Sequence, residues 1–303
     1  MNETIRRILC CPACGGALKE NGQAQAEAYL CKPCNLVFPV VRGIPRMMVT
    51  PVEAEPAAVS FGYQWSARNT GRFEIETLYG LGKEEELKVF LNAFNLKASD
   101  LKGKIILDAG CGDGVLLSLL GEHSADAIGI DINTSITIPH ERCRQYPNVT
   151  VLQSDITRPC IQRGSVDILW CEGVIVHTSD PQKAFQALSE LVKPGGRLYL
   201  WVYPSDRLSV YQRIRDWLFV PYRLPRPLLR VLSNVLAVAL FPLMRATGRK
   251  RSLRTLSWDL FDNLSPRYQW RYAEEEVRSM FLQAGFVDLH VKGTVGIVGT
   301  KSA

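Results

Sequence analysis

The chain has 303 residues, of which 47% are hydrophobic and 22% charged, a globular composition that excludes a mainly disordered, collagen-like or coiled-coil protein. Lys and Arg number 36 against 30 Asp and Glu, so the net charge is +6. No run of 18 or more apolar residues occurs, which argues against a simple membrane span, and the N-terminus lacks a signal-peptide core. We therefore expect a cytoplasmic protein.

The nine cysteines include two pairs with the spacing of metal ligands. Cys11 and Cys14 form one C-x2-C pair, and Cys31 and Cys34 form a second after sixteen intervening residues. Two residues between paired cysteines let both sulfurs reach one tetrahedral ion from a single turn. The pattern predicts a zinc ribbon over residues 1–50. Its Zn²⁺ is expected to be structural, because four thiolates leave no open coordination position.

An aromatic cluster follows the ribbon. Residues 50–58 include two prolines and are expected to form a loop, after which Phe61, Tyr63 and Trp65 fall within five residues. Their rings either pack on the main core or form a lid over a ligand. In the second case Tyr63 and Trp65 would face the substrate of the site.

The central region predicts strands that alternate with helices. Such alternation is typical of a parallel, doubly wound α/β sheet. The expected strands span 105–107, 127–130, 149–152, 166–171 and 197–203, and the expected helices 115–120 and 181–192.

The first of these strands ends in an unusual glycine loop. Asp108 is followed by Gly110-x-Gly112-x-Gly114, whereas the dinucleotide fingerprint reads G-x-G-x-x-G. A carboxylate at Asp108 would repel a pyrophosphate and suits a ligand with an ammonium or sulfonium charge.

Acidic residues also end the next two strands. Asp131 is placed to accept hydrogen bonds from ribose hydroxyls, although alone it could equally mark an NAD site. Asp155 is placed for an adenine amino group, although its Ser-Asp context is also common in turns. With Asp108, the two acids outline an adenosine with a cationic tail.

These motifs resemble the class I S-adenosylmethionine-dependent methyltransferases, over roughly residues 60–300. The resemblance rests on Asp108–Gly114, Gly129–Asp131, Ser154–Ile156, Val176–Pro181 and Lys193–Gly196. It implies a mostly parallel, seven-stranded sheet that closes with an antiparallel hairpin, here fitted by 286–291 and 295–299. The first 50 residues look like the four-cysteine ribbon often joined to such domains.

The resemblance also implies a cofactor, S-adenosyl-L-methionine, and the residues that hold it. The glycine loop with Asp108 is assigned to the methionine moiety, Asp131 to the ribose, and Asp155 with Ile156 to the adenine. The full set of expected cofactor contacts is Asp108, Gly110, Cys111, Gly112, Gly114, Asp131, Ile132, Asp155, Ile156 and Cys171.

Candidates for the chemistry lie at the ends of the fourth and fifth strands. A general base is needed only when the acceptor must lose a proton, because methyl transfer from a sulfonium is largely a matter of positioning. His177 is the best candidate, since its neutral form accepts a proton near pH 7; the alternative is that it orients the following helix. Tyr203 is a second candidate. The fourth strand lacks the Asn/Asp-Pro-Pro-Tyr motif common in enzymes that methylate nucleobase amines.

An insert at residues 204–270 carries the whole basic excess. Residues 217–258 contain no Asp or Glu and eight basic residues, so removing them changes the net charge from +6 to −2. Three interpretations stay open: a lid over the acceptor pocket, a basic amphipathic segment on an anionic membrane, or phosphate contact with RNA. At its end, Arg267 and Tyr268 either face the acceptor or pin the insert to the core.

We therefore expect a ribbon at 1–50, a linker and helical cap at 51–103, a cofactor-binding core at 104–203, the insert at 204–270, and a final helix and hairpin at 271–303. The expected function is methyl transfer to a biosynthetic small molecule that is lipid- or saccharide-linked. The alternatives are a ribosomal or transfer RNA methyltransferase and a non-catalytic scaffold. The expected location is the cytoplasm, peripheral at the inner membrane surface if the insert binds lipid.

Overall fold

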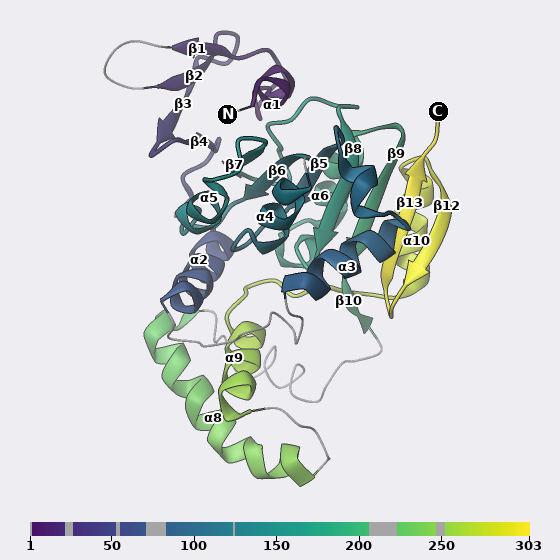
Figure 1. Cartoon of the computed structure of the whole chain (residues 1–303). Helices are drawn as coiled ribbons and strands as arrows, with labels where there is room; N and C mark the ends of the chain where they lie inside the picture. The colour runs from purple at the N-terminus through teal and green to yellow at the C-terminus, as the bar shows by residue number, and fades with distance from the viewer. Residues whose placement is uncertain are drawn as a thin grey trace.

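A computed structural model describes residues 2–21, 27–52, 55–70, 83–123, 125–205, 223–246 and 252–303. Its centre is one twisted sheet with helices on both faces (Figure 1). The strand order is β1-β2-β3-β4-β7-β6-β5-β8-β9-β13-β12. The seven strands from β7 to β12 form the predicted doubly wound core, and four ribbon strands extend it.

The core alternates strands and helices as predicted. Strands β5 to β9 pair in parallel, β13 runs antiparallel to β9, and β12 closes the hairpin. The strands are buried on both faces because α4, α5, α6 and α10 cover them. Their sequences are therefore nearly continuous runs of apolar residues. The core elements are β5 (Ile105–Ala109), α4 (Val115–Glu122), β6 (Asp126–Asp131), α5 (Thr137–Cys143), β7 (Val149–Ser154), β8 (Val166–Glu172), the 3₁₀ turn η3 (Ile175–His177), α6 (Pro181–Ser189), β9 (Val192–Trp201), α10 (Glu274–Gln283), β12 (Phe286–Lys292) and β13 (Gly296–Lys301).

The ribbon is joined to this core by backbone pairing. Strand β4 runs parallel to β7, with Arg46 opposite Gln153 and Met47 opposite Ser154. Ile5 and Met47 are fully buried within the main hydrophobic core. The ribbon therefore shares a core with the central domain. Its elements are α1 (Glu3–Ile8), β1 (Lys19–Asn21), β2 (Ala28–Cys31), β3 (Leu36–Val41) and β4 (Ile44–Met47).

A cap and an insert cover the carboxyl edge of the sheet. Helix α8 lies beside α9, and their shared core of Leu229, Phe261 and Leu264 receives Tyr63 from α2 (Figure 1). The remaining parts of the insert, residues 206–222 and 247–251, lie outside the described residues. The elements of residues 56–101 and 203–272 outside the core described above are α2 (Pro56–Asn69), α3 (Lys83–Phe94), the 3₁₀ turn η2 (Ala98–Leu101), β10 (Tyr203–Pro204), α8 (Arg226–Ala246), α9 (Leu253–Leu264) and β11 (Arg271–Tyr272).

Several predicted boundaries were wrong. The expected loop at 50–58 ends early because α2 begins at Pro56, whose fixed φ suits the first helical turn. Helix α6 ends at Ser189 instead of 192, and β9 then runs through the expected Pro-Gly-Gly turn with a shift of register. The strand expected at 197–203 stops at Trp201, and Tyr203 begins the separate strand β10.

Candidate functional site

A cavity of about 560 Å³ opens where β6, β7 and β8 end. This edge is where open parallel sheets bind ligands, beside the point at which the strand order reverses. The ribbon contributes Pro12 and Met47 to the wall. Nine of the residues predicted for the site line the cavity, namely Trp65, Gly110, Asp131, Ile132, Asp155, Ile156, His177, Arg267 and Tyr268.

The glycine loop is held in a conformation that side chains would obstruct. Gly110, Gly112 and Gly114 have φ values of +88°, +53° and +77°, in the left-handed region. A Cβ on Gly110 would lie 2.3 Å from Val174, and one on Gly112 would lie 2.7 Å from the Trp65 ring. The loop therefore brings bare backbone to the cavity edge, and Trp65 covers it from α2.

Two carboxylates at the strand ends organise the cavity floor. Asp131 is only 8% exposed and accepts 2.8 Å hydrogen bonds from the backbone N–H groups of Gly112 and Asn133. Asp155 accepts from the backbone N–H and the hydroxyl of Thr157, both at 2.8 Å, so it also forms the turn that its sequence context allowed. Each oxygen retains acceptor capacity toward a ligand.

Negative charge is concentrated near the glycine loop. Burial and the neighbouring acids Glu86, Asp131 and Glu172 raise the pKa of Asp108 well above its usual range. The pKa of Glu86 rises to about 7, chiefly through burial, and desolvation likewise raises the pKa of Glu172, at the end of β8, to about 7. Such a cluster is electrostatically suited to a cation, which would draw these groups back to their charged forms.

His177 is oriented by two predicted residues. Its Nδ1 lies 2.9 Å from the carbonyl oxygen of Tyr268, which can only accept, so the neutral ring carries its proton on Nδ1. Nε2 is then the basic nitrogen, and the Tyr203 hydroxyl donates to it across 3.3 Å. The Phe61 ring packs against the imidazole with centroids 4.9 Å apart.

Comparison with known proteins identifies the domain. A family model described as "Methyltransferase domain" matches residues 107–200. A ubiquinone biosynthesis O-methyltransferase of Coxiella burnetii (strain Dugway 5J108-111) is 34% identical over 101 residues, covering 33% of this chain and 43% of that protein. One from Acinetobacter baylyi is 33% identical over 113 residues, covering 36% and 48%. The chain thus spans less than half the length of these curated relatives.

A solved structure shares the fold. The Haemonchus contortus Phospholethanolamine N-methyltransferase 2, in complex with phosphomonomethylethanolamine and S-adenosylhomocysteine, matches with a TM-score of 0.50 at 16% identity, over 82% of this chain and 47% of that one. Residues 107–200 therefore match a methyltransferase domain, within a fold of the class I methyltransferase type. The class I methyltransferase fold predicted from the sequence motifs is therefore confirmed.

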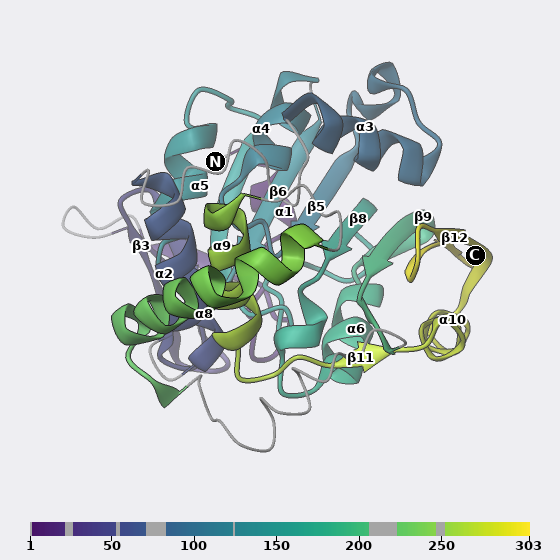
Figure 2. The same ribbon diagram turned by 90° about the horizontal axis from the view of Figure 1, so that it is seen from below.

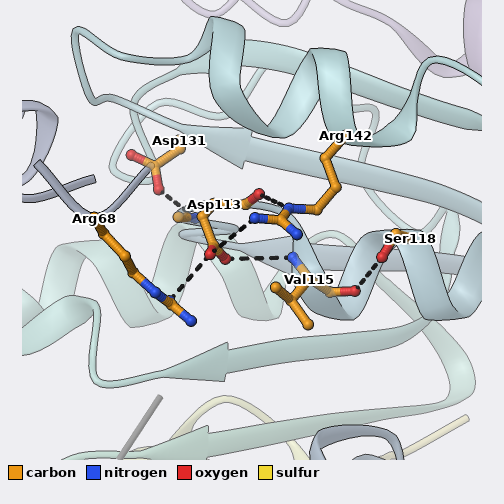
Figure 3. Close-up of polar contacts among 7 residues, drawn as sticks. Arg68, Asp113, Val115, Ser118, Asp131 and Arg142 are labelled. Atoms are coloured by element: carbon orange, nitrogen blue, oxygen red, sulfur yellow. Dashed lines mark hydrogen bonds and ion pairs between the residues drawn. The ribbon is translucent and has the colours of Figure 1, made fainter. Parts of the chain in front are cut away.

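An ionic clamp ties the cap to the glycine loop of the methyltransferase domain (Figure 3). Asp113 is 7% exposed and pairs with Arg68 of α2 at 3.0 Å and with Arg142 of α5 at 3.4 Å. Arg142 also donates from Nε to the Asp113 carbonyl at 2.8 Å. Neither these pairs nor the role of Glu86 emerged from sequence reasoning, although Asp113 belongs to the glycine motif itself.

The other predicted site residues lie outside the cavity lining. Cys171, an expected cofactor contact, is instead fully buried among apolar side chains of the core, and burial raises its pKa to about 12. The Cys111 sulfur packs toward Gly129 under the loop. Gly114 is the N-cap of α4 against Pro139. Tyr63 contacts Phe261 of the insert, with ring centroids 5.6 Å apart.

The four predicted metal ligands converge in the ribbon. The sulfurs of Cys11, Cys14, Cys31 and Cys34 all lie within 4.8 Å of one another, and those of Cys14 and Cys31 are 3.6 Å apart. A tetrahedral Zn²⁺ with Zn–S bonds of 2.3 Å requires sulfurs about 3.8 Å apart, so the cluster fits this ion. The Gly16 N–H also donates to the Cys14 sulfur.

The turns around the cysteines use residues that tolerate a left-handed backbone. Gly15 and Asn35 both adopt positive φ, +70° and +51°, which glycine and asparagine adopt more readily than other residues. Cys10 instead bonds through its backbone N–H to the Cys160 carbonyl and stays outside the cluster.

Proposed function

We propose that this protein transfers a methyl group from S-adenosylmethionine to a hydroxyl group of a lipid-linked biosynthetic small molecule. The observation that carries the proposal is a single cavity whose lining includes Asp131, Asp155 and His177. Cofactor and acceptor could therefore meet within one cavity, where positioning supplies much of the rate.

Residues of the cavity would hold the cofactor by its polar groups. Asp131 would accept hydrogen bonds from ribose hydroxyls and Asp155 from the adenine amino group. The charge of Asp108, with Glu86 and Glu172, would stabilise positive charge beside the glycine loop. S-adenosylmethionine, when bound, supplies an electrophilic methyl carbon on a positively charged sulfur.

The acceptor end would use His177 as general base. Because Nδ1–H is engaged by the Tyr268 carbonyl, Nε2 can take the hydroxyl proton of the acceptor as its oxygen attacks the methyl carbon. Tyr203 would hold the same nitrogen until the acceptor replaces it. The choice of oxygen is supported by the names of the curated relatives, which are O-methyltransferases.

The lipid linkage is supported by the way α2 joins the cavity to the insert. Phe61 and Trp65 line the cavity from α2, and Tyr63 on the same helix packs against the apolar core of α8 and α9. An acceptor with a hydrocarbon portion would find apolar surface next to its reacting group.

In the ribbon, we propose a structural Zn²⁺ on the four cysteines, because the arrangement of their sulfurs fits this ion.

The proposal is tested by following a tritiated methyl group from S-adenosylmethionine. The purified protein is incubated with an organic-solvent extract of cells and, separately, with their total RNA. We expect label in the organic extract, and a loss of about 100-fold or more for His177→Gln, in the range typical of a removed general base. Label in RNA would support the RNA alternative, and cofactor binding without transfer to either pool would support a scaffold; both results contradict the proposal.

A further inference from the structure

The outer face of α8 is a continuous apolar stripe. Val231, Val235 and Val238 are 57%, 60% and 62% exposed, with Leu228 and Leu243 also exposed at the two ends. Leu228, Val231, Val235 and Val238 are separated by three or four residues, so these four side chains lie on one side of the helix. Exposed apolar patches of this length on a folded domain mark interaction surfaces.

The opposite face of α8 is already used for packing. Leu229, Ser233, Ala237 and Met244 are buried, and Leu229 packs with Phe261 and Leu264 of α9. Figure 2 shows α8 lying across the underside of the molecule, in front of α9 and the central sheet. The stripe therefore faces away from the rest of the described chain.

Charge distinguishes among the partners that such a stripe could meet. Residues 217–258 contain no Asp or Glu and carry eight basic residues. Among these, Arg226 and Arg230 lie in the first turns of α8, and Arg245 lies in its last turn. A second copy of the chain docked on this face would bring two stretches of the same positive charge close together, which is unfavourable. An anionic surface complements them.

We propose that α8 docks the protein onto an anionic lipid surface, with its valine stripe entering the boundary between headgroups and acyl chains. An amphipathic helix with basic flanks binds membranes in this way, lying in the interface plane. This inference does not depend on methyl transfer. Combined with the proposed function, it places the cavity beside the lipid layer that would hold the acceptor.

The helix would lie on the membrane instead of crossing it. By length and composition, α8 is the one helix of the described residues that could span a bilayer, with a mean hydropathy of 1.8 in its most apolar window. Spanning would require α8 to leave α9 and to expose Ser233 and the Phe261 contact. Pro242 within the helix and Arg230 in its second turn also disfavour a span.

Vesicle sedimentation with the full chain tests the proposal. The vesicles are phosphatidylcholine alone or phosphatidylcholine mixed with phosphatidylglycerol. The variant Val231→Glu/Val238→Glu places two charges in the stripe. The control Leu282→Glu/Val287→Glu adds the same charge at exposed apolar positions of α10 and β12. A thermal melt of each variant confirms that it is folded, and Val231→Ser/Val238→Ser repeats the test without added charge.

We expect the wild type and the control to sediment with the mixed vesicles, more strongly at low salt, and weakly with phosphatidylcholine. Both stripe variants should bind the mixed vesicles at least about tenfold less tightly. Equal binding by stripe and control variants would overturn the proposal. So would a wild-type dimer that the stripe variants convert to monomer while vesicle binding stays absent. Neither readout involves S-adenosylmethionine, so failure of the docking surface is distinct from failure of the methyltransferase proposal.

Discussion

Removal of the Asp113 carboxylate should destabilise the protein far more than removal of an ordinary surface ion pair. The Asp113 side chain is 10% exposed, and its partners Arg68 and Arg142 are 14% and 29% exposed. Truncation of one partner of a buried pair costs about 3 to 5 kcal/mol, because it leaves buried charge uncompensated. Since Arg142 keeps some solvent, we expect Asp113→Ala to lose about 3 kcal/mol, the lower end of that range.

The assay is thermal unfolding followed by circular dichroism or calorimetry. A loss of about 3 kcal/mol corresponds to a fall in Tm of about 5 °C for a chain of 303 residues, at about 2.1 cal/mol/K of unfolding entropy per residue. The matched control is Glu274→Ala, which removes the half-exposed Arg278–Glu274 pair at 3.1 Å on α10 and should cost less than about 0.5 kcal/mol. If Asp113→Ala and Glu274→Ala lower the Tm equally, the clamp is not a buried interaction and the argument fails.

Three further predictions follow from the cavity and the ribbon. Gly110→Ala should weaken S-adenosylmethionine binding at least about tenfold by calorimetry, because its Cβ meets Val174 and the left-handed φ is strained; unchanged affinity would contradict the tight loop. Chelation of zinc should lower the Tm of the whole chain in a single transition, since β4 pairs with β7; a separate early transition would show an independent ribbon. Cofactor affinity should fall as pH drops from 8 to 6, because Glu172 and Glu86 have pKa values of about 7 and attract a cation only when ionised. Conversely, the stability of the cofactor-free protein should fall as pH rises from about 4.5 to about 7, because over this range the native state holds protons that the unfolded chain has lost, and Glu172→Gln should reduce both slopes.

Much of the site could be predicted because it follows from strand ends. Carboxyl ends of parallel strands meet at one edge of a sheet, so Asp131 and Asp155 share the cavity wall although they are far apart in sequence. The glycine spacing likewise identified the loop in which Gly110 and Gly112 adopt positive φ. The cluster of four cysteine sulfurs could also be predicted, because the spacing of the two C-x2-C pairs is that of metal ligands.

Features that depend on packing between distant elements could not be predicted. The pairing of Met47 in β4 with β7 extends one sheet edge, and nothing in the ribbon sequence specifies that partner. The Glu86 carboxyl lies on α3, within the expected helical cap, but the sequence did not indicate which part of the core this helix contacts, so the place of Glu86 near Asp108 was not predicted. These contacts arise only when the whole sheet is assembled.

The aromatic cluster shows how the bounds of a helix change the interpretation of the residues within it. Residues 61–65 belong to α2, in which side chains four apart share a face and those two apart point to different sides. Phe61 and Trp65 therefore line the cavity together, whereas Tyr63 packs against the insert. Recognition of α2 from the sequence would have separated the lid residues from the packing residue.

The central claim is that the cavity binds S-adenosylmethionine at the carboxylates of β6 and β7. Calorimetric titration of the cofactor into the wild type, Asp131→Ala and Glu274→Ala tests it most directly. We predict one site per chain in the wild type and in Glu274→Ala, with binding at least about tenfold weaker in Asp131→Ala, because a charged hydrogen-bond acceptor is removed. Absence of binding by the folded wild type, or equal affinity for all three proteins, would contradict the account.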